Sequence, residues 1–351
     1  MPPKLSLTIP GLNPDKTKID DFIRSLPHEI PHLTLDQIPR ASNIRFPEST
    51  FGTGYISEDG QHAVKNINLK QRIEQTSINY TVDNIIESLK SELKNYYAIT
   101  QICPESFCKL VGYHYDIHNT TLIIVMENCG TDLFDIYSTE SKPDEKTQIN
   151  HIGQIIVVIE CLHQNWFVHF DIKPENVVLH ENTIKLIDAG SLTYVNVYNN
   201  IVYVRGTDFY MAPELQGKPK IANSVGLLST DIYSLGVLFL LMILPLGRFI
   251  NKLFKNMNQS KFSDNIDDSD KRIIETWLKR VFGEAIKFEH FFGEPIERLT
   301  IQQLKSMYQQ KQSLDQTKPS GGRSICKINK RRSNKRRLDR RQRKSKSNSN
   351  K

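Results

Sequence analysis

The sequence predicts an α+β fold with two lobes, a small β-rich lobe followed by a larger helical lobe. Residues 44–67 have a strand-like pattern that is interrupted by a turn at Ser57-Glu58-Asp59-Gly60. Two further apolar runs, 109–113 and 121–126, also suit strands. Helical spacing dominates after them. This change in pattern predicts that the β-rich lobe ends near residue 127.

One predicted helix precedes the last two strands, and the others follow them. Apolar residues recur at helical spacing with polar residues between them, first at Ile85, Ile86, Leu89, Leu93 and Tyr97 and again at Ile152, Ile155, Ile156, Ile159 and Leu162. Residues 235–243 are apolar on every side, which is typical of a buried helix. Later helices are predicted at 271–281 and 299–309.

Composition divides the chain into three parts. Residues 1–43 contain many prolines and show no sustained period, so we expect an N-terminal extension that wraps or precedes the domain. The domain is predicted at 44–312, with lobes at about 44–127 and 132–312. Residues 313–351 are rich in Ser, Lys and Arg and are expected to be a disordered basic tail.

Overall composition is that of a globular protein, with 38% hydrophobic and 24% charged residues. The longest apolar stretch, 235–246, is too short to cross a bilayer and contains Pro245, so no membrane partner and no secretory leader are expected. The five cysteines form no CxxC pair. Their odd number and scattered positions predict reduced thiols in an intracellular protein.

The strongest chemical signal is the stretch 169–176, followed by Asp188-Ala189-Gly190. Phosphoryl transfer needs an acidic group that orients the attacking hydroxyl, a cation that steadies the moving phosphoryl group, and oxygen ligands for Mg²⁺. Asp171, Lys173 and Asn176 have these chemical properties within one loop, and Asp188 follows an apolar run. One such residue alone would suit a turn or a helix cap. The whole set predicts a phosphoryl-transfer site.

In sequence, H-F-D-I-K-P-E-N at 169–176 and D-A-G at 188–190 resemble the protein-kinase signatures H-R-D-L-K-P-E-N and D-F-G. R-G-T-D-F-Y-M-A-P-E at 205–214 resembles the end of the family's activation segment, G-T-x-x-Y-x-A-P-E. The resemblance extends over about residues 46–310. It implies the bilobal protein-kinase fold, protein substrates, and the cofactors ATP and Mg²⁺.

This resemblance assigns roles to individual residues. It implies that Asp171, Lys173 and Thr207 are catalytic and that Asn176 and Asp188 bind the metal. Thr207 is expected to hydrogen-bond with Asp171 and Lys173.

Scaffolding roles follow from two further motifs. P-I-E-R-L-T at 295–300 resembles the family's late P-x-x-R-x-T motif, which implies that Glu214 pairs with Arg298. T-D-I-Y-S-L-G at 230–236 resembles a helix start at which Asp231 fixes the backbone of the catalytic loop.

The resemblance also implies a set of nucleotide-binding residues. Ala63-Val64-Lys65 is similar to the strand whose Lys grips the phosphates, and its partner is a helical Glu, for which Glu92 is favoured over Glu87. The remaining candidates lie at the glycine-rich loop, the segment joining the lobes, and the ribose site: Gly52, Glu127, Cys129 and Asp132.

Three departures from the family pattern bear on activity and regulation. Pro47 and Ser49 stand where the glycine loop usually has glycines. Phe170 replaces an Arg that clamps a phosphorylated activation loop, so little dependence on such phosphorylation is expected. Ala189 replaces a Phe that packs beneath the helix carrying Glu92, which leaves a void unless a neighbour fills it.

These observations favour a serine/threonine protein kinase, because tyrosine kinases usually lack the loop residue corresponding to Lys173. A pseudokinase that binds or scaffolds is the alternative, and the degenerate glycine loop together with Ala189 would suit it. A third hypothesis is that the basic tail is the functional part and tethers the protein to nucleic acid.

The chain's net charge of +7 conceals a strong asymmetry. Residues 323–351 hold fourteen Lys or Arg and one acidic residue, Asp339. Clusters such as Lys330-Arg331-Arg332 suit binding to a nuclear-import receptor and a nuclear or nucleocytoplasmic location, with 327–346 as the signal. Nucleic acid is the alternative partner. The tail has no aromatic residues, so base stacking is unsupported.

Overall fold

A computed structural model describes most of the chain between residues 30 and 317, namely 30–49, 52–69, 82–116, 118–139, 141–195, 206–207, 209–215, 224–255 and 266–317. Side chains are described for all of these except 46–49, 82–88, 224–225 and 252–255. The chain forms two compact units, 1–308 and 309–351, and the first contains the fold and the site.

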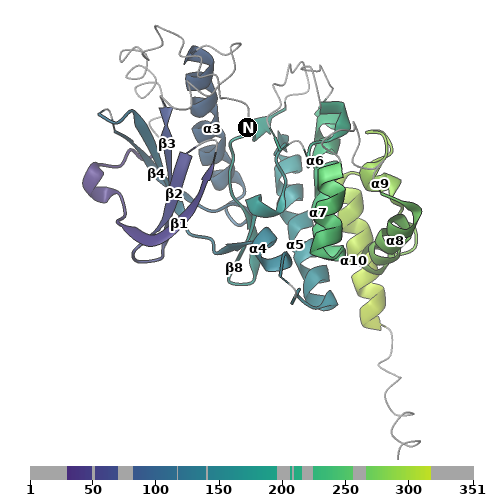
Figure 1. Ribbon diagram of the computed structural model, residues 1–351. Helices are drawn as coiled ribbons and strands as arrows, with labels where there is room; N and C mark the ends of the chain where they lie inside the picture. The colour runs from purple at the N-terminus through teal and green to yellow at the C-terminus, as the bar shows by residue number, and fades with distance from the viewer. Residues whose placement is uncertain are drawn as a thin grey trace, which may run out of the picture. The chain divides into compact units, whose positions relative to one another are not determined.

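An antiparallel five-stranded sheet forms the first lobe (Figure 1), with strand order β1-β2-β3-β5-β4. Its strands are β1 (Ala41–Ser49), β2 (Gly52–Ser57), β3 (His62–Asn68), β4 (Leu110–Asp116) and β5 (Thr121–Glu127). Ile67 on β3 is fully buried in the hydrophobic core and brings one face of the sheet against it. The predicted strands are confirmed, although β1 begins three residues before residue 44.

The edge strand β4 is covered by a segment of the N-terminal extension. Leu33 donates its backbone N–H to the carbonyl of Tyr113 at 2.7 Å, and Tyr113 donates to the carbonyl of Pro31 at 3.0 Å. The imidazole Nδ1 of His114 lies 2.9 Å from the carbonyl of Leu33. Ile30 is buried in the core. Residues 30–33 therefore pair with the exposed edge of the sheet and satisfy its backbone groups.

Helix α3 (Val82–Ile102), which separates β3 from β4 in the sequence, lies beside the strands in Figure 1. The helical lobe follows the sheet. Its α-helices are α4 (Leu133–Tyr137), α5 (Glu145–Gln164), α6 (Ser224–Ile243), α7 (Leu246–Lys255), α8 (Asp268–Phe282), α9 (Glu289–Phe292) and α10 (Ile301–Thr317). Short strands β6 (Thr131–Asp132), β8 (Val177–His180) and β9 (Thr183–Leu186) form a second sheet, and β7 (Phe167–Val168) pairs with β10 (Thr193–Tyr194). Among the described residues there are also three 3₁₀ turns, η1 (Leu35–Gln37), η2 (Pro174–Asn176) and η3 (Pro213–Leu215).

Helix α6 is the core of the helical lobe. Side chains from Leu235 to Met242 are all buried, as the all-apolar pattern predicts. The window 226–243 is long and apolar enough to cross a membrane, but 83% of it is buried inside the protein, which is typical of a core helix. Lys142 closes the C-terminal end of α6 by donating to the carbonyls of Leu241 and Leu244, at 2.5 Å each.

The expectation of reduced cysteines is wrong for four of the five. Disulfides join Cys103 to Cys161 and Cys108 to Cys129. The paired Cα atoms lie 6.2 and 6.0 Å apart, within the usual reach of a disulfide. Sequence spacing could not reveal these pairs, because the fold brings together residues 58 and 21 positions apart. The fifth, Cys326, lies outside the described residues.

The last helix extends beyond the predicted domain end. Helix α10 runs to Thr317, five residues past residue 312, so 313–317 are helical and do not begin a disordered tail. The rest of the predicted tail, 318–351, lies outside the described residues.

Candidate active site

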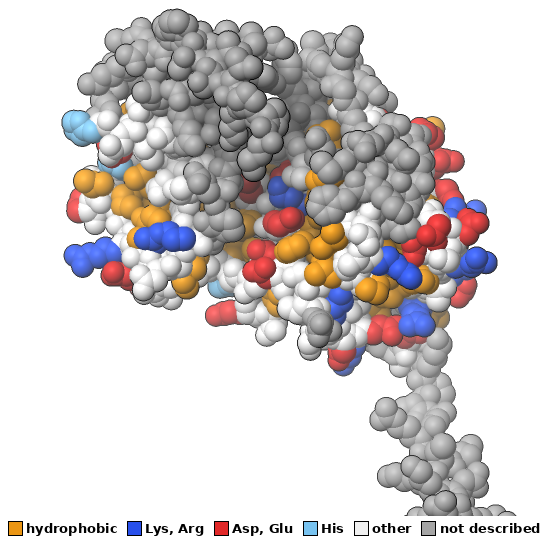
Figure 2. Space-filling model, in the orientation of Figure 1, with side chains coloured by type: hydrophobic (Ala, Val, Ile, Leu, Met, Phe, Trp, Pro, Cys, Tyr) orange, Lys and Arg blue, Asp and Glu red, His pale blue; other side chains and the backbone are white. Residues whose placement is uncertain are grey.

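A cavity of about 770 Å³ lies between the sheet and the helical lobe. Figure 2 shows acidic and basic side chains next to one another in the hollow of this face. All eleven predicted site residues line the cavity: Gly52, Lys65, Glu92, Glu127, Cys129, Asp132, Asp171, Lys173, Asn176, Asp188 and Thr207. They come from both lobes, from positions up to 155 apart in the chain.

Lys65 on β3 links helix α3 to the turn that carries Asp188. Its Nζ lies 3.4 Å from Oε1 of Glu92 and 3.6 Å from Oδ1 of Asp188. Glu92 is 6% exposed, so its charge is paired and not solvated. The structure thus places Glu92 beside Lys65, and the side chain of the alternative, Glu87, lies outside the described residues.

Asp188 has a positive φ of 62° and accepts a hydrogen bond from the backbone N–H of Gly190 at 3.0 Å. The ammonium of Lys65 holds the pKa of Asp188 below its usual range, and the N–H of Gly190 acts in the same direction against the effect of burial. Its carboxylate is therefore charged near neutral pH. That is the state a divalent cation requires.

Asp171, Lys173 and Thr207 form a closed hydrogen-bonded group. Thr207 donates both its backbone N–H and its hydroxyl to Oδ1 of Asp171, each at 2.8 Å. Nζ of Lys173 lies 2.9 Å from Oδ2 of Asp171 and donates to the hydroxyl oxygen of Thr207 at 2.8 Å. The predicted contacts of Thr207 are confirmed. They join the activation segment directly to the catalytic loop.

Asn176 fixes the other side of this loop. Its amide nitrogen donates to the backbone carbonyl of Asp171 at 2.8 Å and to Oδ2 of Asp171 at 2.9 Å. Because the amide nitrogen is used in this way, a cation in the cavity would be met by the amide oxygen. Carboxylate and amide oxygens suit Mg²⁺, so Asp188 and Asn176 fit the metal that the resemblance implies. The described residues contain no cluster of three or more His, Cys, Asp or Glu that would indicate a different metal.

Asp231 on α6 binds the backbone of the catalytic loop, as predicted. Its Oδ2 accepts the backbone N–H of His169 at 2.9 Å, and its Oδ1 accepts that of Phe170 at 3.0 Å. Asp231 is fully buried, and His163 on α5 lies 3.0 Å from its Oδ2. The backbone of Phe170 has a φ of +61°, a conformation that is costly for a residue of this type. The two hydrogen bonds from Asp231 help to maintain it.

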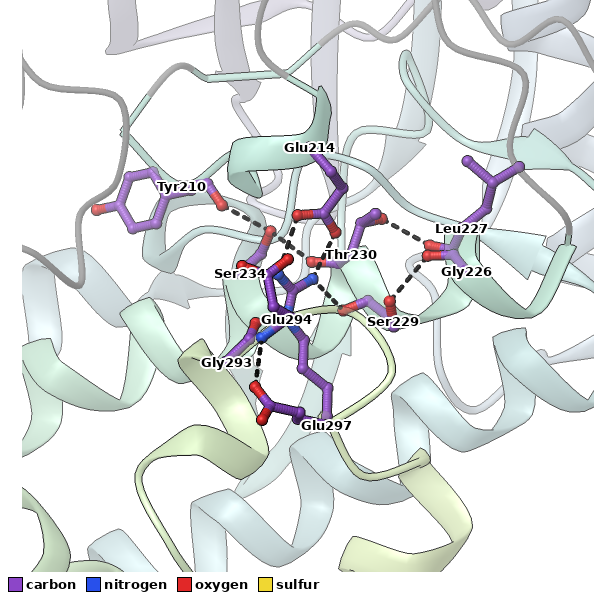
Figure 3. Close-up of polar contacts among 11 residues, drawn as sticks. Tyr210, Glu214, Gly226, Leu227, Ser229, Thr230, Ser234, Gly293, Glu294 and Glu297 are labelled. Carbon is purple, nitrogen blue, oxygen red and sulfur yellow. Dashed lines mark hydrogen bonds and ion pairs between the residues drawn. The ribbon is translucent and has the colours of Figure 1, made fainter.

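The end of the activation segment is fastened by the predicted pair of Glu214 and Arg298. The guanidinium donates to both carboxylate oxygens, at 2.5 and 2.9 Å, and also to the carbonyls of Gly293 and Ser229. Figure 3 shows Glu214 with Gly293 and Ser229 below it, one on either side. Arg298 is 7% exposed. The bidentate pairing satisfies a charge that would otherwise be costly to bury.

The segment joining the lobes places Glu127, Cys129 and Asp132 along the cavity. The carboxylate of Glu127 pairs with Lys185 on β9 at 3.2 Å. Asp132 is the N-cap of α4 and accepts from the N–H of Asp135 at 2.8 Å. Burial raises the pKa of Asp132. Cys129 is tied to Cys108 by the disulfide described above, a constraint that the sequence pattern did not suggest.

Gly52 begins β2 with a φ of +134°. A Cβ at this position would lie 1.9 Å from the backbone carbonyl oxygen of Asn66, so only glycine can be accommodated. Gly54 lies opposite Lys65 in the ladder between β2 and β3. Residues 50 and 51 and the side chains of Pro47 and Ser49 lie outside the described residues.

Sequence reasoning missed Asn95 and Tyr96, which lie on α3 beyond Glu92. Asn95 donates its side-chain amide to the carbonyl of Leu192 at 2.7 Å. Tyr96 lines the cavity and is 3% exposed. An Asn and a Tyr on an amphipathic helix carry no signal of their own. Their position after a pairing Glu was the only available indication.

Comparison with known proteins agrees with this geometry. Residues 53–316 match the protein kinase domain family. The chain is 28% identical over 201 residues to the SNF1-like protein kinase ssp2 of Schizosaccharomyces pombe, and 31% identical over 202 residues to the carbon catabolite-derepressing protein kinase of Candida glabrata. Each alignment covers 54% of this chain and 32% of the relative. The serine/threonine-protein kinase ULK3 of Rattus norvegicus is 24% identical over 53% of this chain and 41% of its own length.

The chain thus aligns with about a third of the length of the first two relatives. The family match begins within β2, so it contains β3, β4, β5 and the catalytic loop but not β1. Because the family match covers most of its length, this chain belongs to the protein kinase family.

Proposed function

We propose that this protein is a serine/threonine protein kinase that transfers the γ-phosphate of ATP, with Mg²⁺, to hydroxyls of protein substrates. The observation that carries the proposal is the closed group of Asp171, Lys173 and Thr207, which lines the same cavity as Lys65 and Asp188. It supplies a carboxylate for the substrate hydroxyl and an ammonium for the phosphoryl group. Three compared relatives carry protein-kinase names.

Phosphate transfer from radiolabelled ATP to a generic basic protein tests the proposal. The wild type should label the substrate in the presence of Mg²⁺, and Asp188→Ala should abolish the labelling, because Asp188 is one of two proposed metal ligands. Thr276→Val, which removes an exposed hydroxyl from α8, is the matched control and should label normally. Equal background in wild type and Asp188→Ala would instead favour the pseudokinase alternative.

The finer part of the proposal concerns regulation. Phe170 is 3% exposed and packs in an apolar cluster with Val168, Val195 and Leu227. This cluster joins the catalytic loop to residues just after β10 and to the start of α6. In this proposal, the apolar packing replaces the contact between a phosphate and an arginine that the family pattern implies. Activity should therefore depend little on phosphorylation of the activation segment.

Phosphatase treatment of the purified protein tests this regulatory proposal. Activity should persist after a phosphatase has removed all phosphate from residues 189–213, as verified by mass spectrometry. Loss of most activity on dephosphorylation, with recovery after incubation with ATP, would contradict it.

For the basic tail we propose binding to a nuclear-import receptor, supported by the basic clusters within 327–346. Deleting residues 323–351 should exclude the protein from the nucleus and leave substrate phosphorylation unchanged. Loss of nucleic-acid retention at low salt, without a change in location, would favour the tether alternative.

A further inference from the structure

The position of Ala189 raises the question of what fills the space beneath α3. Ala189 is 2% exposed, and its side chain is the smallest that has a Cβ. Tyr96 lies one helical turn after Glu92, and both Tyr96 and Ala189 belong to the same hydrophobic core and line the same cavity. A tyrosine ring on the helix thus belongs to the same core as the methyl group that the turn supplies.

The Tyr96 ring is part of an aromatic column that reaches the catalytic loop. It meets Phe107 edge-on, with ring centroids 6.2 Å apart. Phe107 in turn stacks on His169 at 6.3 Å. Contacts of this kind stabilise a buried arrangement beyond the area they bury. The column ends at the residue two positions before Asp171.

The hydroxyl of Tyr96 is the unusual feature of this column. It is buried and makes no hydrogen bond with any of the described residues. An unsatisfied buried hydroxyl destabilises a fold, so its retention needs a reason. Burial and then the negative charges of Asp188 and Glu127 raise the pKa of Tyr96, so the group is a hydrogen-bond donor at every working pH.

We propose that Tyr96 is a positioning residue for Asp188: its ring takes the place of the phenylalanine missing at position 189, and its hydroxyl donates toward the Asp188 carboxylate, directly or through a water molecule, when nucleotide and Mg²⁺ are bound. This inference rests on the proposed function in that Asp188 is taken as a metal ligand. Oδ1 of Asp188 already accepts from Gly190 and faces Lys65. A third donor would fix the carboxylate in one orientation toward the metal.

The hydroxyl is tested by Tyr96→Phe, which keeps the ring. Thermal unfolding of the ligand-free protein should show an unchanged or higher Tm, because the variant removes an unsatisfied polar group. The Mg²⁺ concentration that half-saturates binding of a non-hydrolysable ATP analogue should rise several-fold, and kcat should fall about tenfold. An unchanged Mg²⁺ requirement would overturn the role of the hydroxyl.

Tyr137→Phe is the matched control. Its hydroxyl is also buried but lies 2.9 Å from Nδ1 of His151, far along the chain from the metal-binding turn. This variant should lower the Tm and leave the Mg²⁺ requirement unchanged. The different Tm changes and Mg²⁺ requirements expected for the two Tyr→Phe variants separate positioning from simple packing.

The role of the Tyr96 ring is tested by transferring an aromatic ring from position 96 to position 189. Tyr96→Leu should lower the Tm because it opens a void, and Ala189→Phe should lower it because two rings compete for one space. The double variant Tyr96→Leu/Ala189→Phe should recover most of the loss, a coupling that a double-mutant cycle measures. Additive effects of the two changes would overturn the compensation.

Binding and unfolding are measured without turnover, so the outcome is separate from the proposed kinase activity. A wild type that binds Mg²⁺-nucleotide but transfers no phosphate would contradict the proposed function, and a weaker Mg²⁺ response of Tyr96→Phe in that protein would still support the role of Tyr96. A wild type that binds no nucleotide would overturn the role of the hydroxyl.

Discussion

Asn95 on α3 donates its side-chain amide to the backbone carbonyl of Leu192 at 2.7 Å. This hydrogen bond ties the helix to the chain just beyond Asp188, Ala189 and Gly190. On the same helix Glu92 approaches that turn, since a Cβ on Gly190 would lie 3.4 Å from the Glu92 carboxylate. The helix is thus bonded to the segment after the metal-binding turn and lies close to the turn itself.

Removing this amide should loosen the helix from the turn. We predict that Asn95→Ala lowers kcat three- to tenfold and raises the KM for ATP, because Glu92 then holds Lys65 less firmly. Steady-state kinetics with varied ATP measures both quantities.

Gln154→Ala is the control for Asn95→Ala. Its side chain also bonds to backbone, at Asn182 and Ile184, and none of these three residues lines the cavity. It should lower the Tm without changing the KM for ATP. Equal kinetic effects of the two variants would contradict the special role of Asn95.

The hydroxyl of Thr207 should matter more than its methyl group. Thr207→Val keeps the shape and the backbone N–H bond to Asp171, but it removes the hydroxyl that donates to Asp171 and accepts from Lys173. We expect kcat to fall ten- to a hundredfold, because Asp171 and Lys173 lose a shared partner at the reaction centre. Thr207→Ser keeps the hydroxyl and should retain most of the activity. A serine variant as impaired as the valine variant would assign the effect to packing.

Much of the site could be predicted because its chemistry needs particular residue types at fixed spacing. Asp171, Lys173 and Asn176 lie within six residues, and Asp188 follows a short strand. The strand-to-helix order likewise followed from periodicity. What the sequence could not indicate were contacts between distant residues of ordinary type. The bond from Asn95 to Leu192, the Cys103–Cys161 bridge and the pairing of residues 30–33 with β4 depend on tertiary proximity alone.

The Cys103–Cys161 disulfide should stabilise the fold against unfolding. It joins the residue after α3 to α5 across a sequence separation of 58, and closing such a loop restricts the unfolded chain. We predict that Cys161→Ser lowers the free energy of unfolding by about 3–4 kcal/mol. This value is the upper end expected from the entropy that the unfolded chain gains when the loop is opened. Urea unfolding under non-reducing conditions measures it.

Thiol counting provides an independent check of the bridge. Alkylation of the denatured, non-reduced protein followed by mass spectrometry should label one cysteine, Cys326, and leave four unmodified. Cys326→Ser is the control and should not change the unfolding free energy. Labelling of all five cysteines in the wild type would contradict the disulfides.

Burial of His151 on α5 should make stability depend on pH. Its side chain is 5% exposed and lies 2.9 Å from the Tyr137 hydroxyl, and burial lowers the pKa of His151 below its usual 6.5. Between pH 7 and 5 the unfolded chain therefore binds more protons at this residue than the folded one, so the free energy of unfolding falls as the pH drops. The contribution of His151 to this loss of unfolding free energy is at most about 2 kcal/mol at pH 5.

The contribution of His151 is isolated by a difference, because burial also lowers the pKa of His290 and adds to the same trend. Urea unfolding at pH 7, 6 and 5 should give a shallower decline for His151→Gln than for the wild type, since glutamine keeps an acceptor for Tyr137 but takes up no proton in this range. His118→Gln changes an exposed histidine and should leave the slope as it is. If His151→Gln and the wild type lose stability in parallel, the proton that destabilises the fold binds at another residue.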